Sequence, residues 1–122
     1  MSTHSNIGYR TADNGIFGTY CHFDGAFRGV GAELQLYLES NGADYLRARI
    51  YQGAMQNGFS SFTSLGGKTY FEMRSESNKF IITDMYAFIH DHQYAYILEL
   101  DGSLSAYSDG MKQESWFSQL ES

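Results

Sequence analysis

The sequence predicts a single α+β domain, spanning residues 1–122, in which an antiparallel sheet packs against one main helix. Two patterns support this prediction: short segments in which apolar and polar residues alternate, and one longer segment in which apolar residues recur at helical spacing. A chain of 122 residues is long enough for one domain with one modest core. We expect a sheet of about four to six strands, and two or three shorter helices beside the main one.

The first predicted elements are the two strands of a β-hairpin. Ile7 and Tyr9 alternate with polar or small residues between positions 5 and 11, and residues 16–22 form the returning strand. Residues 12–15 between them read Ala-Asp-Asn-Gly, and Asn and Gly best tolerate the positive φ of a tight turn. The pattern therefore predicts a hairpin.

The main helix is predicted over residues 27–39. Its apolar residues recur three or four positions apart: Phe27, Val30, Leu34, Tyr37 and Leu38. Asp24 stands where an N-cap belongs, so we expect its carboxylate to accept a hydrogen bond from the first backbone N–H groups. Gly29 and Gly31 each weaken the first turns by up to about 1 kcal/mol relative to alanine, which indicates a close approach to the backbone there.

The second half of the chain adds shorter elements. A second helix is predicted over residues 44–55, with Leu46 and Ile50 facing inward. Residues 57–67 are polar and rich in glycine and serine, which predicts a loop, and Thr83 is expected to cap a short helix. The remaining predicted elements are strands over residues 69–74, 79–83, 93–100 and 103–108, the last two joined by a turn at Asp101 and Gly102, and a terminal helical turn over residues 114–120.

Composition excludes several classes of protein. The net charge of −6 argues against binding to duplex nucleic acid, because such proteins need clustered Lys and Arg for their phosphate contacts. The single cysteine excludes an internal disulfide and suits a reducing cytoplasm. No run approaches the roughly 18 apolar residues of a membrane span. We therefore expect a cytoplasmic protein that contacts neither duplex nucleic acid nor a membrane.

One segment combines more chemically distinctive groups than any other. Tyr20 and His22 share one face of the returning strand, Asp24 follows if the strand continues, and Arg28 comes one turn into the helix. A helix N-terminus with glycines can bind an anion, and a tyrosine ring can stack on a base. The residues expected to bind a small nucleotide-type ligand are Tyr20, His22, Asp24, Arg28, Gly29 and Gly31.

The same residues also have a purely structural interpretation. Asp24 would then only cap the helix, His22 would bond to backbone, and Arg28 would lie in solvent. In the ligand-binding interpretation, the Asp24 carboxylate disfavours a highly charged anion. It favours a ligand that also carries hydrogen-bond donors, such as a ribose.

Neither Cys21 nor the later histidines predict a catalytic or metal site. Cys21 and His22 are adjacent on a strand, so their side chains point to opposite faces and cannot form a dyad. Cys21 shares its face with Thr19 and Phe23, which we interpret as the core side. Residues 90–92 read His-Asp-His at a predicted helix end, where two histidines two positions apart do not share a face. We expect no catalytic residue, no metal and no cofactor.

Two segments resemble a group of small uncharacterised phage proteins. Residues 18–25 read Gly-Thr-Tyr-Cys-His-Phe-Asp-Gly and residues 29–31 read Gly-Val-Gly. They are similar to that group's Tyr-Cys-His-Trp-Asp-Gly segment and Gly-Val-Gly helix entry, with Phe23 in place of tryptophan. Residues 94–102, with a Tyr-Ala-Tyr strand and an Asp-Gly turn, are similar to its C-terminal hairpin. The resemblance implies a phage accessory protein that acts in an infected bacterium, and no established activity comes with it.

These observations lead to one preferred function and two alternatives. We expect a non-enzymatic counter-defence protein that sequesters a small nucleotide-type immune signal in the host bacterial cytoplasm, as a homo-oligomer. The first alternative is an inhibitor that binds a bacterial defence or host protein through an acidic, aromatic-rich surface. The second is a small nucleotide hydrolase with His22, His90 or His92 as general base.

Overall fold

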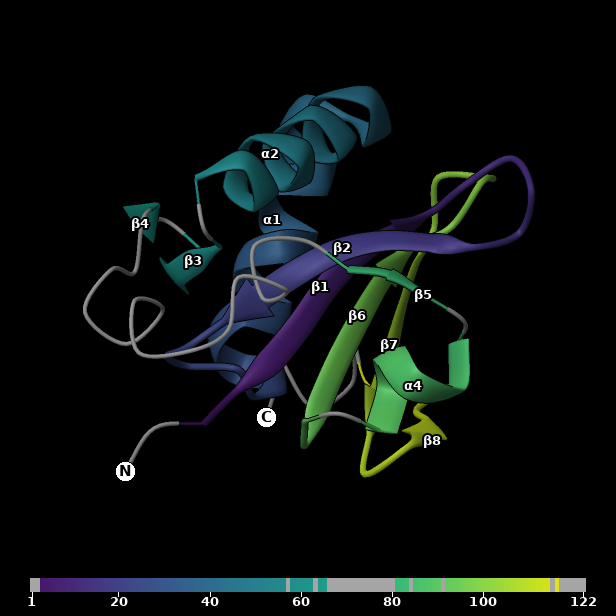
Figure 1. Cartoon of the computed structure of the whole chain (residues 1–122). Coiled ribbons are helices and arrows are strands. Elements are labelled where there is room, and N and C mark those ends of the chain that lie inside the picture. The colour runs from purple at the N-terminus through teal and green to yellow at the C-terminus, as the bar shows by residue number, and fades with distance from the viewer. Residues whose placement is uncertain are drawn as a thin grey trace.

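The computed structural model describes residues 3–56, 58–62, 64–65, 81–83, 85–90, 92–114 and 116, and it has the predicted α+β class (Figure 1). The elements in chain order are β1 (Ser5–Arg10), β2 (Ile16–Cys21), the π-helical turn η1 (Phe27–Gly31), α1 (Ala32–Asn41), α2 (Ala43–Met55), β3 (Phe59–Ser61), β4 (Ser64–Leu65), β5 (Ile81–Thr83), α4 (Met85–His90), β6 (Tyr94–Leu98), β7 (Leu104–Ser108) and β8 (Met111–Lys112). The predicted strand over residues 69–74, the cap at the start of α4 and most of the predicted terminal turn lie outside the described residues.

The strands form one mixed sheet with the order β4-β3-β2-β1-β6-β7-β8, and β5 also pairs with β2. Most neighbours are antiparallel, but β1 pairs with β6 and β2 pairs with β3 in parallel. The expectation of a purely antiparallel sheet is therefore wrong at these two pairs. Parallel neighbours need a long crossover connection, and both pairs have one: η1, α1 and α2 lie between β2 and β3, and residues 11–93 lie between β1 and β6.

Both predicted hairpins are confirmed. The first is in register from Ser5 opposite Cys21 to Arg10 opposite Ile16, and Asn14 in its turn has a φ of 68°. The second joins β6 to β7 through a turn in which Gly102 has a φ of 89°. The carboxylate of Asp101 accepts hydrogen bonds from the backbone and side chain of the next serine and so closes this turn.

The sheet buries a core on each face, because neighbouring residues of its strands point to opposite sides. Figure 1 shows α4 in front of the sheet and α1 behind it. The core beneath α1 and α2 contains Ile7, Cys21, Leu34, Leu46, Ile50, Tyr96 and Leu98. The core beneath α4 contains Ile16, Phe88, Ile89, Ala95, Ile97 and Tyr107. The alternation along β6, from Ala95 to Leu98, thus supplies both cores.

A pair of glycines positions α4 on its face of the sheet. Gly8 of β1 lies opposite Gly18 of β2. A Cβ added at Gly8 would lie 3.0 Å from the ring of Phe88, and one added at Gly18 would lie 2.8 Å from it. The ring therefore occupies the space that two side chains would need. Nδ2 of the buried Asn6 also donates to the carbonyl of Phe88 at 3.1 Å, which ties α4 to the end of β1.

The predicted main helix is present, but it begins differently from the prediction. Its first turn is the π-helical η1, which continues directly into α1. The side chain of Asp24 does not cap it, because the N-cap position is Ala26 and makes no side-chain hydrogen bond. Asp24 instead adopts a φ of 59°, and its backbone carbonyl accepts the N–H of Val30 at 2.6 Å. A Cβ on Gly29 would fall only 2.2 Å from that same carbonyl oxygen.

Helix α2 is confirmed with both of its predicted inward residues. Leu46 and Ile50 are fully buried in the core that α2 shares with α1. After α2 the chain forms β3 and β4 within the segment that was predicted as a loop, so that prediction is wrong for residues 59–61 and 64–65. A strand of three residues is too short to show an alternating pattern, which explains the failure.

We expect Gly29→Ala to destabilise the fold although alanine is the better helix former. The added methyl group would collide with the backbone carbonyl of Asp24, which cannot rotate away as a side chain can. Such overpacking costs about 1–3 kcal/mol, and the gain in helix propensity offsets at most about 1 kcal/mol of it. Urea unfolding measures the difference. Ala48→Gly on the exposed side of α2 is the control for propensity alone, and a Gly29→Ala variant as stable as the native chain would contradict the assignment.

Candidate functional site

Three histidines meet at one end of the central strands of the sheet because of how β1, β2 and β6 are paired. His4 precedes β1, His22 follows β2 and His92 lies just before β6. Ser5 is paired with Cys21 on one side and with Tyr94 on the other. Antiparallel β2 therefore ends where β1 and β6 begin.

The three rings surround the side chain of Tyr20, and these four residues are called the histidine cluster below. Tyr20 is only 1% exposed, whereas the three histidines are half-buried. The Tyr20 hydroxyl lies 2.8 Å from Nδ1 of His4 and 3.0 Å from Nδ1 of His22. The rings of His4 and His22 stack with centroids 4.7 Å apart, and the His92 ring lies 4.7 Å from that of Tyr20. The cluster is a phenol under three partly accessible imidazoles.

The hydrogen bonds determine where the ring protons lie. Nδ1 of His4 is 2.9 Å from the carbonyl oxygen of His22, which can only accept, so His4 must carry a proton on Nδ1. The single Nδ1–H of His4 is then shared between the His22 carbonyl and the Tyr20 hydroxyl, and this hydroxyl donates its own proton to Nδ1 of His22. In the neutral rings, His22 therefore has its proton on Nε2 and His4 has its lone pair on Nε2. Two stacked imidazoles thus differ in character, one a donor and the other an acceptor at Nε2.

Backbone contacts hold both ends of the cluster. The N–H of Gly25 donates to the carbonyl of Thr3 at 2.9 Å and fixes the segment that carries His4. A Cβ on Gly25 would lie 2.9 Å from the backbone of His4, so this approach requires glycine. The N–H of His22 donates to the carbonyl of Phe59 at 3.1 Å, which ties the end of β2 to β3. The cluster is thereby held by rigid strands.

An exposed aromatic ring lies beside the cluster. Phe23 is 45% exposed, and its ring centroid lies 4.4 Å from that of His22 at an interplanar angle of 68°. The expectation that Phe23 faces the core with Cys21 is wrong, because β2 ends at Cys21 and the alternation of faces ends with it. Phe23 offers a flat apolar surface to a ligand at the edge of the cluster.

The structure brings together only part of the predicted ligand pocket. Tyr20 and His22 lie in contact, as their shared strand face predicts. Asp24 turns the chain toward the opposite face, where η1 joins the core under α1. Gly29 lies against the backbone of Asp24, and Gly31 is buried, with a Cβ there lying 3.1 Å from both Tyr96 and Trp116. Arg28 and Asp24 are exposed. The two glycines thus have structural reasons for their presence.

The prediction that Cys21 is buried is confirmed. Its side chain is 0% exposed and lies in the core beneath α1 and α2. Burial raises the pKa of the Cys21 thiol to about 12, so almost no thiolate forms near neutral pH. A thiol in this setting does not act as a nucleophile.

The two later histidines have separate roles. His90 ends α4, and its Nδ1 lies 2.9 Å from the carbonyl of Tyr86 one turn earlier. His92 joins the histidine cluster instead. Among the described residues, no group of three or more His, Cys, Asp or Glu side chains is arranged to hold a metal ion.

His4 and His92 were not predicted as members of the site. They lie 88 positions apart, and only the parallel pairing of β1 with β6 brings them together. The available signal was weak, because each histidine stands within two residues of a predicted strand start. A comparison of strand ends would have found them only with the correct sheet order.

Comparisons with known proteins add no further information about this site. No protein-family model matches the chain, and neither does any curated protein or solved structure. In the part of the chain that the structure describes, no helix is long and apolar enough to cross a membrane. The assignment of the site therefore rests on its geometry.

The proton arrangement can be measured by long-range ¹H–¹⁵N NMR spectra of the histidine rings above pH 8. We expect the neutral His4 ring to carry its proton on Nδ1 and the neutral His22 ring to carry its proton on Nε2. His90 provides an internal control, because its contact with the Tyr86 carbonyl also requires a proton on Nδ1. A His4 ring protonated on Nε2 would contradict the network described above.

Proposed function

We propose that the chain binds a small nucleotide-type ligand at the histidine cluster and sequesters it. The observation that supports this most is the convergence of three partly exposed histidines on Tyr20: His4 and His22 contact its hydroxyl, and His92 packs against its ring. Imidazoles donate hydrogen bonds to phosphate oxygens, and do so more strongly when protonated. A neutral imidazole can both donate and accept hydrogen bonds, which suits a ligand that carries both kinds of group, as a phosphorylated ribose does.

The neighbouring surface supplies the other groups that such a ligand needs. The exposed ring of Phe23 can stack on a base, which by alanine substitution is worth about 1–3 kcal/mol per base in single-stranded nucleic-acid complexes. Asp24 follows directly and can accept hydrogen bonds from ribose hydroxyls. Arg28 is exposed in the first helical turn, and an arginine can pair with a phosphate. Gly29 and Gly31 are no longer part of the proposed pocket.

The biological setting is proposed from the resemblance to phage proteins. A phage protein that sequesters a nucleotide-type signal would protect the phage from a bacterial defence system that depends on that signal. Such a protein would act in the host cytoplasm, and a homo-oligomer could enclose the ligand between two copies of the histidine cluster. This biological setting, like the ligand class, is part of the proposal.

A protein-binding inhibitor is the second candidate function. The observation in its favour is a set of large apolar side chains exposed on α1 and α2: Leu36, Tyr45, Tyr51 and Met55. Together with the net charge of −6, this surface suits a partner with a basic, partly apolar face. Its binding would weaken at high salt and would be unaffected by changes in the histidine cluster.

A ligand-depletion assay tests the proposed function. The purified protein is mixed with cyclic oligonucleotides and ADP-ribose isomers, free ligand is measured after filtration, and the retained fraction is heated to release its contents. We expect one ligand to be depleted and recovered intact. His22→Ala should weaken binding about tenfold or more, the loss of a hydrogen bond to a charged group.

His90→Ala is the matched control, because His90 is exposed and lies outside the cluster. Recovery of a converted ligand would show that the protein hydrolyses the ligand instead of sequestering it, and His4, with a lone pair on Nε2, would be the candidate base. If the His22→Ala and Tyr20→Phe variants still deplete the ligand, the binding site lies outside the histidine cluster. If no ligand is depleted, the small-molecule proposal is wrong.

A further inference from the structure

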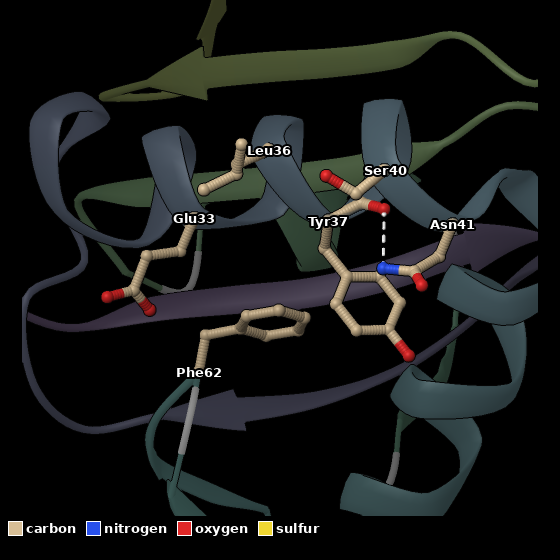
Figure 2. Close-up of a pocket in the computed structure, with 6 residues that line it drawn as sticks. All are labelled: Glu33, Leu36, Tyr37, Ser40, Asn41 and Phe62. Carbon is tan, nitrogen blue, oxygen red and sulfur yellow. Dashed lines mark hydrogen bonds between the residues drawn. The ribbon is translucent and has the colours of Figure 1, made fainter.

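A cavity lies along α1, and none of the residues that line it belongs to the histidine cluster. Its volume is about 400 Å³. Figure 2 shows α1 above the phenyl ring of Phe62, with the side chains of Glu33 and Tyr37 extending from the helix toward the level of that ring. The residues that line the cavity are Glu33, Leu36, Tyr37, Ser40, Asn41 and Phe62. The cavity belongs to the sheet face covered by α1, whereas Tyr20 and the histidines lie on the face of α4.

The walls of this cavity are apolar and already ordered. The rings of Tyr37 and Phe62 meet edge to face, with centroids 5.7 Å apart and an interplanar angle of 87°. Arg49 supports Phe62 from another side, with its guanidinium carbon 5.8 Å from the ring centroid and its NH2 group donating to the carbonyl of Phe62. Leu36 forms the outer wall and is 64% exposed. Two fixed aromatic rings and a leucine favour an apolar ligand body.

The Glu33 carboxylate and the Asn41 amide oxygen are acceptors at the two ends of the cavity. The hydroxyls of Tyr37 and Ser40, which also line it, can donate or accept. No hydrogen bond or ion pair joins the Glu33 carboxylate to another described residue. Partial burial, and then the nearby Asp24 carboxylate, raise the pKa of Glu33 above the usual range of a glutamate. At the other end, Asn41 uses its Nδ2 on the carbonyl of Tyr37 at 3.2 Å, so its amide oxygen is the group left to accept. A cation beside Glu33 would relieve an unfavourable charge.

The spacing of these groups limits the length of a ligand. Glu33 and Asn41 are eight residues apart on one continuous helix. A rise of 1.5 Å per residue places them about 12 Å apart along the axis. A ligand that spans the cavity therefore has the length of a chain of about eight carbon atoms.

We propose that this cavity binds an elongated organic cation whose apolar body lies between Leu36 and Phe62 and whose ammonium group pairs with Glu33. An anion is disfavoured by Glu33 and by the net charge of −6. A neutral apolar ligand would cover the carboxylate without replacing its lost water. A second amine at the far end of the ligand would donate to the Asn41 oxygen. The proposal is independent of the function assigned to the histidine cluster.

Three eight-carbon probes of matched length test the charge requirement. Octylammonium, octanol and octanoate differ only in their head groups and are titrated into the ¹⁵N-labelled chain. We expect octylammonium to shift the amide signals of α1 and Phe62 and to bind at least tenfold more tightly than the other two. Equal affinity for the alcohol or the carboxylate would overturn the proposal, as would shifts that avoid the cavity.

Glu33→Gln should weaken octylammonium binding about tenfold, since it replaces a charge-assisted hydrogen bond with a neutral one. Glu39→Gln is the matched control, because Glu39 lies on the same helix but outside the cavity and accepts from Gln35. Both positions are exposed, so both variants should fold, which circular dichroism checks. If both variants lost affinity for octylammonium equally, the effect would come from the change in net charge alone, and binding at Glu33 would be contradicted. His22→Ala should leave octylammonium binding unchanged, which separates this proposal from the proposed function.

Discussion

The structure depends on strand β1 being paired along both of its edges. Its antiparallel partner β2 is adjacent in sequence, whereas its parallel partner β6 begins 84 residues after β1 ends. This double pairing makes β1 the centre of the sheet and leaves both of its faces to be covered. The glycine pair at Gly8 and Gly18 then admits the ring of Phe88 on one face, while Ile7 enters the core on the other. The histidine cluster is a consequence of the same pairing, because it lies where the ends of three neighbouring strands coincide.

At the turn formed by Asp24 and Gly25, the chain passes from the end of β2 to the sheet face that η1 and α1 cover. The left-handed conformation of Asp24 directs the chain from the end of β2 into η1, and Gly25 contacts the segment that carries His4. The hydroxyl of Tyr96 donates to the carbonyl of Gly25 at 2.6 Å, which anchors the turn to the core. The segment richest in distinctive residues is thus mainly a structural corner. His22 and Phe23 remain at the accessible ends of the strands, where we propose that the ligand binds.

Sequence patterns predicted the elements that are determined by residues close together in the chain. The residues around Asn14 and Asp101 predicted both hairpins, and the spacing of apolar residues predicted α2 and most of the main helix. Three features depend on contacts distant in sequence and were not predicted: the parallel pairing of β1 with β6, the short strand β3, and the approach of His4 and His92 to Tyr20. The cap expected at Asp24 was wrong for a further reason. Its backbone carbonyl, rather than its carboxylate, makes the contact with the helix.

A double-mutant cycle between His4 and Tyr20 tests most directly whether the cluster forms as described. His4→Ala, Tyr20→Phe and the double variant are unfolded in urea, and the coupling is the departure of their free energies of unfolding from additivity. The contact of 2.8 Å predicts a coupling of about 0.5–1.5 kcal/mol. His90→Ala combined with Tyr20→Phe should be additive, since His90 contacts Tyr86 instead. If the effects of His4→Ala and Tyr20→Phe on the free energy of unfolding were additive, the two side chains would not interact, which would contradict the hydrogen-bonded cluster.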